Sequence, residues 1–193
     1  MRVPDLFVSA DQLMTSLVSQ VTETQWDGRV PTTPKWSVVE LVAHGVDENR
    51  WVGDMLAGRR IADVKDQYAT DPIDAADPLT SWNEASESAQ AAVLALADLD
   101  RTVHLSFGDT TAEEYLQQMV IDRLIHSWDL ARAIDAPTDL PVPLVEAAWT
   151  WFEPQAESWR SAGMLGAAIA VPDNADTQSK LLALSGRDAR PQS

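Results

Sequence analysis

The sequence predicts an all-α fold, a four-helix bundle whose helices are joined by long crossover loops. Several long stretches repeat apolar residues at the three- and four-residue spacing of an amphipathic helix. Only one short stretch alternates apolar and polar residues as a strand does. The connections of roughly 10–20 residues are longer than those of a simple up-and-down bundle.

The first two predicted helices are separated by a loop that cannot be helical. Residues from about 5 to 24 carry apolar side chains at helical spacing, and the segment DGRVPTTPKW that follows contains Gly and Pro. Ser37 and Glu40 form a capping box, in which the Ser hydroxyl accepts a backbone N–H and the Glu side chain reaches back. This box opens a second helix, which we expect Gly58 to end.

The middle of the chain combines a surface loop, a third helix and a short extended segment. Residues 59–78 are polar and interrupted by proline, which predicts a loop, and residues 79–99 return to helical spacing. Val103, Leu105 and Phe107 alternate with polar residues, which is typical of a strand. A Gly-Asp pair then turns the chain into the next helix.

The longest predicted helix, from Thr111 to about Asp135, carries two ionisable residues on a largely apolar stripe. Asp122 and His126 lie four residues apart and therefore on one helical face. Burying such groups is costly unless they are paired or bind a metal. Their spacing allows three interpretations: a hydrogen bond on the helix surface, a structural pair in the core, or two ligands of a metal ion.

The C-terminal part predicts two shorter helices. Pro143 suits the first turn of one helix, and residues 176–184 form a last short helix that Gly186 ends. The segment between them, GMLGAAIAVPDN, is ambiguous and could be extended. We expect one domain over residues 1–193, with residues 171–193 as a C-terminal extension of it.

Composition excludes several classes of function. The net charge is −16, with 30 acidic against 14 basic residues, which disfavours nucleic acids and anionic membranes as partners. The chain has no cysteine, so any thiol chemistry needs a thiol from outside the protein. No apolar stretch is long enough for a membrane span or a signal peptide, and we expect a cytoplasmic protein. Most of the eight Trp residues are expected in the core.

A metal site is one chemistry that two of the three His residues allow. His44 borders the apolar stripe of the second predicted helix, so it could meet Asp122 and His126 from the longest one. Two imidazoles and a carboxylate suit a divalent metal such as Zn²⁺ or Ni²⁺ and leave positions open for water or substrate. His104 is instead expected to be an edge-strand residue, and the pair Asp47-Glu48 to lie on a solvated surface.

Three segments resemble one protein family. WSVVELVAH at residues 36–44, followed by NRW at 49–51, is similar to the first metal-site helix of the DinB-like superfamily. The nearest branch is the mycothiol-dependent maleylpyruvate isomerase group and its actinobacterial relatives. DRLIHSWDLARA at residues 122–133 resembles the second signature of that branch, and LLALSGRD at 181–188 resembles its C-terminal end.

The resemblance implies a DinB-like bundle with a divalent metal held by one His from the second helix and an acidic residue and a His from a later helix. These positions correspond to His44, Asp122 and His126. The isomerase has Glu where this chain has Asp122, a carboxylate shorter by one methylene. The resemblance also implies a low-molecular-weight thiol such as mycothiol as cofactor, used in S-transfer or isomerisation.

We therefore expect a metal-dependent, mycothiol-type transferase or isomerase that acts on a small molecule. Arg50 and Arg123 are candidate cofactor-binding residues, as clamps for an anion, because they lie near the expected ligands in sequence. One alternative is a bundle that binds metal or a small ligand without turnover. The other is a structural Asp122–His126 pair in an interaction protein, for example a homodimer.

Overall fold

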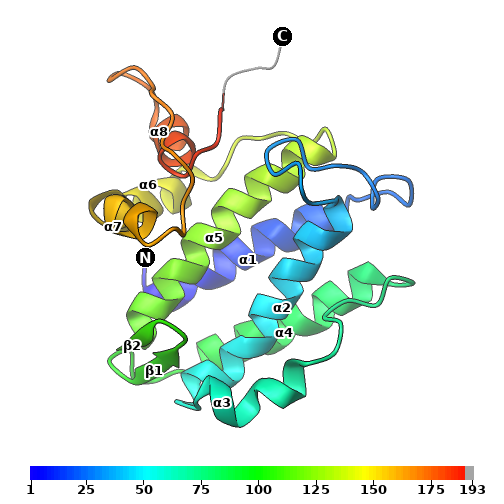
Figure 1. Ribbon diagram of the computed structural model, residues 1–193, viewed down its shortest axis with the longest axis vertical. Coiled ribbons are helices and arrows are strands. Elements are labelled where there is room, and N and C mark those ends of the chain that lie inside the picture. Colours follow the sequence, from blue (N-terminus) through cyan, green and yellow to red (C-terminus); the bar gives the residue numbers. More distant parts are fainter. Residues whose placement is uncertain (190–193) are drawn as a thin grey trace. The chain divides into compact units, whose positions relative to one another are not determined.

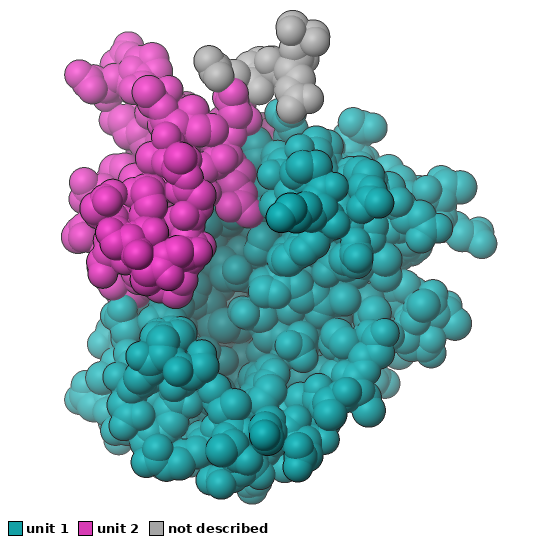
Figure 2. Space-filling view, viewed as in Figure 1, with its two compact units in different colours: residues 1–137 teal, residues 138–193 magenta. Residues whose placement is uncertain are grey.

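The computed structural model describes residues 1–189, and the chain forms two compact units, residues 1–137 and 138–193 (Figure 2). Residues 190–193, which end the expected C-terminal extension, lie outside the described residues. A single domain over the whole chain stays a prediction. Within residues 1–189, no helix combines the length and the apolar character needed to cross a membrane.

The first unit is built on long helices that pack side by side as a bundle (Figure 1). These helices are α1 (Val3–Val18), α2 (Val38–Leu56), α4 (Pro78–Leu94) and α5 (Ala112–Ala133). Helix α1 packs against α4 and α5, and α2 packs against the same two helices. The predicted all-α, four-helix class is confirmed.

The connections of the bundle contain more regular structure than the sequence predicts. The predicted loop after α2 holds a short helix α3 (Ile61–Val64) and a 3₁₀ turn η1 (Lys65–Tyr68). Elements of four residues are too short to show a helical period in sequence. The extended segment is one arm of a hairpin, in which β1 (Thr102–Leu105) pairs antiparallel with β2 (Gly108–Thr111). The Thr111 hydroxyl then caps α5 by accepting the backbone N–H of Glu114.

The second unit consists of short helices around α6. It contains α6 (Val142–Phe152), the 3₁₀ turn η2 (Glu153–Gln155), α7 (Ala156–Ser161) and α8 (Thr177–Leu184). Helix α8 begins at an Asp176 cap and packs against α6. The Gln178 side chain donates to the carbonyl of Thr138 and accepts from the N–H of Leu140, which ties α8 to the start of the unit. The ambiguous segment before α8 contains no strand in its described residues.

A buried polar network joins the helices of the bundle. Asp11 of α1 and Arg123 of α5 are almost fully buried, with 3.4 Å between Arg123 Nε and Asp11 Oδ1. Asn49 of α2 donates to Asp11 over 3.0 Å and accepts from Arg123 over 3.0 Å. Ser86 of α4 also donates to Asp11. Because each helix contributes a partner, the network fixes how the helices register against one another.

Helix α2 crosses this network at Gly45. A Cβ there would lie 2.5 Å from Arg123 Nη1 and 2.7 Å from the Trp82 ring, so the site has room only for glycine. The Arg123 guanidinium lies 5.2 Å from the centre of the Trp82 ring. Trp82 and Trp128 are fully buried, but the other Trp residues are half-buried, so the expectation that most of them belong to the core is wrong. An indole that borders a loop or pocket keeps one edge accessible.

Candidate metal centre

The bundle brings His44 of α2 together with Asp122 and His126 of α5. One ligand atom from each residue lies within 4.8 Å of the others. Asp122 Oδ1 is 3.3 Å from Nε2 of His126 and 3.6 Å from Nε2 of His44. The three residues predicted from the sequence therefore converge at one place between two helices. That they bind a metal stays a prediction.

The second carboxylate oxygen of Asp122 indicates that this cluster suits a cation. Asp122 Oδ2 is buried and has no hydrogen-bond partner among the described residues. A buried carboxylate oxygen without a donor loses its hydration and gains nothing in return, so a cation at this place would compensate it. Two imidazole nitrogens and one carboxylate oxygen are a ligand set that divalent metals accept. The residues present fit a divalent cation.

Asp129 orients one of the two imidazoles. Its Oδ2 lies 3.0 Å from Nδ1 of His126, and its Oδ1 accepts a hydrogen bond from the Thr32 hydroxyl. A carboxylate only accepts, so Nδ1 carries a proton, and in the neutral ring, the form that binds a metal, the lone pair is on Nε2, the nitrogen that faces Asp122. The sequence analysis missed Asp129, although its position three residues after His126, on the same helical face, was a signal that could have found it.

Trp36 covers the two imidazoles. Its ring centre lies 5.1 Å from that of His44 and 5.6 Å from that of His126, and the two His rings meet edge to face at 5.1 Å. The loop before α2 fixes the Trp, because its backbone N–H donates to Thr33 and its carbonyl accepts from Val30. The glycine- and proline-containing loop therefore supplies Trp36 and Thr32 to the site.

The charges in the cluster stabilise one another. Burial opposes the charged form of Asp122, but His126 and His44 outweigh it and hold the pKa of Asp122 well below its usual value. Burial likewise opposes protonated His126, while Asp122 and then Asp129 raise the pKa of His126 to about 9. Without a metal, His126 is therefore a cation at neutral pH, and metal binding must displace its proton.

A pocket of about 220 Å³ is lined by residues on the same faces of α2 and α5. It includes Asp47 and Glu48, which lie three and four residues after His44, and Met119, which lies three residues before Asp122. Glu48 is half-buried there, so the expectation of a solvated surface is wrong for it. Burial and then the negative charge of Asp122 raise the pKa of Glu48 to about 7.

Comparison with known families gives one match. The model of the mycothiol maleylpyruvate isomerase N-terminal domain matches residues 7–131. The chain belongs to this family. The match covers α2, α4, most of α1 and α5, and all three clustered residues. The family membership predicted from the sequence is confirmed. The searches of curated proteins and of solved structures found no match.

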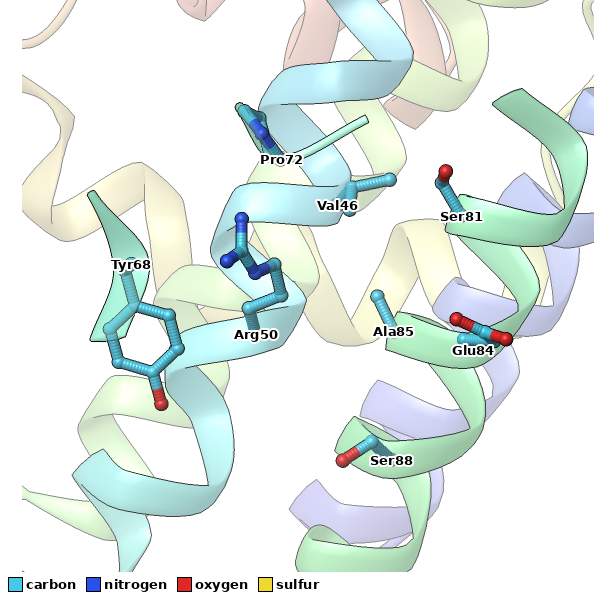
Figure 3. Close-up of a pocket in the computed structure, with 8 residues that line it drawn as sticks. All are labelled: Val46, Arg50, Tyr68, Pro72, Ser81, Glu84, Ala85 and Ser88. Carbon is cyan, nitrogen blue, oxygen red and sulfur yellow. The ribbon is translucent and has the colours of Figure 1, made fainter. Parts of the chain in front are cut away.

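The two arginines proposed as anion clamps have different surroundings in this member of the mycothiol maleylpyruvate isomerase family. Arg123 lies in the buried network with Asp11. Arg50 lines a separate pocket of about 320 Å³ between α2 and α4 (Figure 3). Its guanidinium donates to the carbonyl and hydroxyl of Thr70 and lies 5.5 Å from the centre of the Tyr68 ring. Their role in binding a cofactor stays a prediction.

We expect the metal-free protein to lose stability as the pH rises through about 9. The pKa of His126 is raised above the value of about 6.5 for an unfolded chain. Its stabilising contribution is therefore fully present below about pH 6.5 and is lost as the pH passes about 9, by up to about 3 kcal/mol. Urea unfolding with a chelator at both ends of this range measures the loss. If the variant His126→Gln lost the same stability over this pH range, deprotonation of His126 would not be the cause.

Replacing Asp129 with Asn is expected to weaken zinc binding by about 10–100-fold, because the amide no longer fixes the tautomer and orientation of His126. Competition with a zinc-sensitive dye measures the affinity. Glu113→Gln is the matched control, since Glu113 is an exposed carboxylate at the other end of α5. If both variants bound zinc like the wild type, Asp129 would not support the metal centre.

Proposed function

We propose that the chain is a divalent-metal-dependent enzyme that uses a mycothiol-type thiol, as a transferase or isomerase. The observation that carries this proposal is the cluster of His44, Asp122 and His126, with one buried Asp122 oxygen that no described residue satisfies. Membership of a family named for mycothiol supports the choice of thiol. The chain has no cysteine, so the thiol must come from a cofactor.

Each residue of the site has a task in this proposal. His44, Asp122 and His126 would hold the cation, for which Zn²⁺ and Ni²⁺ are the candidates. A divalent cation there would lower the pKa of a coordinated thiol or water, so that a nucleophile is available near neutral pH. Asp129 keeps His126 in the binding tautomer, and Trp36 limits the access of water to both imidazoles. The pocket lined by Glu48 would receive the substrate.

Titration of the cobalt-substituted protein with mycothiol tests the thiol. Thiolate coordination is expected to give a charge-transfer band in the near ultraviolet, and S-methyl mycothiol, which cannot form a thiolate, is the control. No band at saturating mycothiol would contradict the thiol chemistry and favour a protein that binds metal without turnover. Elemental analysis after incubation with zinc and nickel tests the metal separately. A wild-type protein that stays metal-free would contradict both the metal-dependent enzyme and the protein that binds metal without turnover.

A further inference from the structure

The pocket beside the candidate metal centre continues along the same helical faces. Its α2 residues lie at positions three, four, seven and eleven after His44, and its α5 residues lie three and seven before Asp122. In chain order they are Asp47, Glu48, Trp51, Met55, Tyr115 and Met119. Residues at these spacings follow one side of a helix, so the pocket and the cluster share one stripe.

The charged groups of this pocket are all negative. Among the described residues that line it, Asp47 and Glu48 carry carboxylates, and none is a Lys, Arg or His. Neither carboxylate has a hydrogen bond or ion pair with another described residue. Glu48 is half-buried, so its charge is only partly compensated by water. Burial and the charge of Asp122 raise the pKa of Glu48 and outweigh the positive charges of His44, Arg123 and His126, which lower it. The pocket therefore favours a positive charge from a ligand.

The arginines nearest in sequence do not line this pocket. Arg123 is 1% exposed and is held by Asp11 and Asn49. Arg50 lines the other pocket on the α4 side of α2 (Figure 3). Recognition of a carboxylate usually needs a cation or several N–H donors, and this pocket offers no cation among its described lining residues.

The remaining walls are aromatic and apolar. Trp51 and Tyr115 supply rings, and Met55 and Met119 supply adaptable thioether side chains. The Trp51 ring is held by Tyr68, with 4.2 Å between the ring centres. Fixed aromatic rings bind both apolar bodies and cations, because the ring face carries partial negative charge.

We infer that this pocket binds a cationic amine with an apolar, preferably aromatic, body. The carboxylates of Asp47 and Glu48 receive the ammonium group, and the rings and thioethers enclose the body. That such an amine is the substrate of the metal centre rests on the proposed function. That the pocket binds such an amine does not depend on the proposed function. Maleylpyruvate, for which the family is named, carries two carboxylates and would meet like charges here.

Calorimetry with small probes tests the inference. Phenethylamine, 3-phenylpropionate with the same ring but the opposite charge, and fumarate as a dicarboxylate are titrated at about pH 8, above the pKa of Glu48 of about 7. In the metal-free protein, phenethylamine is expected to bind at least about tenfold more tightly than either anion. Tighter binding of an anion, or no binding of the amine, would overturn the inference.

Two variants test whether the amine binds in this pocket. Glu48→Gln keeps the size of the side chain. It is expected to weaken the binding of phenethylamine about tenfold, in both the metal-free and the zinc-loaded protein. Glu87→Gln, an exposed carboxylate on α4, is the matched control and should change nothing. Equal affinities of the two variants would overturn the inference. None of these readouts uses a thiol, so they remain decisive if the cobalt titration with mycothiol fails.

Discussion

Asp11→Ala is expected to lower the free energy of unfolding by about 3–5 kcal/mol, the largest change in stability that we predict. Asp11 and Arg123 are 0% and 1% exposed, and Asp11 also accepts hydrogen bonds from Asn49 and Ser86. Without the carboxylate, the Arg123 cation stays buried without its ion-pair partner, and its guanidinium keeps the hydrogen bond to Asn49. Urea unfolding followed by circular dichroism measures the loss.

Two further variants separate the buried charge from a simple loss of packing. The double variant Asp11→Ala, Arg123→Met removes both charges and is expected to recover part of the lost stability, because no unpaired ion remains in the core. Asp5→Ala removes an exposed carboxylate of the same helix and should have little effect. A double variant less stable than Asp11→Ala alone would contradict the role of the buried charge.

Local signals explain why the bundle could be predicted from the sequence. The helical period of α2 and its capping box depend only on neighbouring residues, and the structure contains both halves of the Ser37–Glu40 box. The ends of α1 and α4 were less predictable, since Val18 and Leu94 end these helices about five residues before the apolar period does. The period alone does not show where a helix stops.

The clustered residues could be predicted from the sequence, but the residues around them could not. Asp122 and His126 share a helical face, His44 borders the apolar stripe of α2, and the resemblance to the family supported these three residues as one ligand set. The side of α2 on which Glu48 lies depends on how α2 packs against α5, which is a tertiary property. The pairing of Asp11 with Arg123 joins two helices far apart in the sequence. Neither feature leaves a local pattern that the sequence could show.

Removing one ligand is expected to have the largest effect on metal binding. Structural zinc sites with four ligands bind with about 10–16 kcal/mol, or roughly 3 kcal/mol for each ligand. At 1.4 kcal/mol for each factor of ten, His44→Ala should therefore weaken zinc binding by about two orders of magnitude. His126→Ala should do at least as much, since it also removes the imidazole that pairs with both Asp122 and Asp129.

His104→Ala is the matched control for this prediction. His104 is the remaining His of the chain, and it lies on β1 with its Nδ1 2.7 Å from Asp109 Oδ1. Zinc affinity is measured by dye competition, and circular dichroism confirms that each variant is folded. His44 is the more informative ligand, because its side chain is 30% exposed and its loss disturbs the core less than that of His126. A folded His44→Ala that binds zinc as tightly as His104→Ala would contradict the three-ligand site.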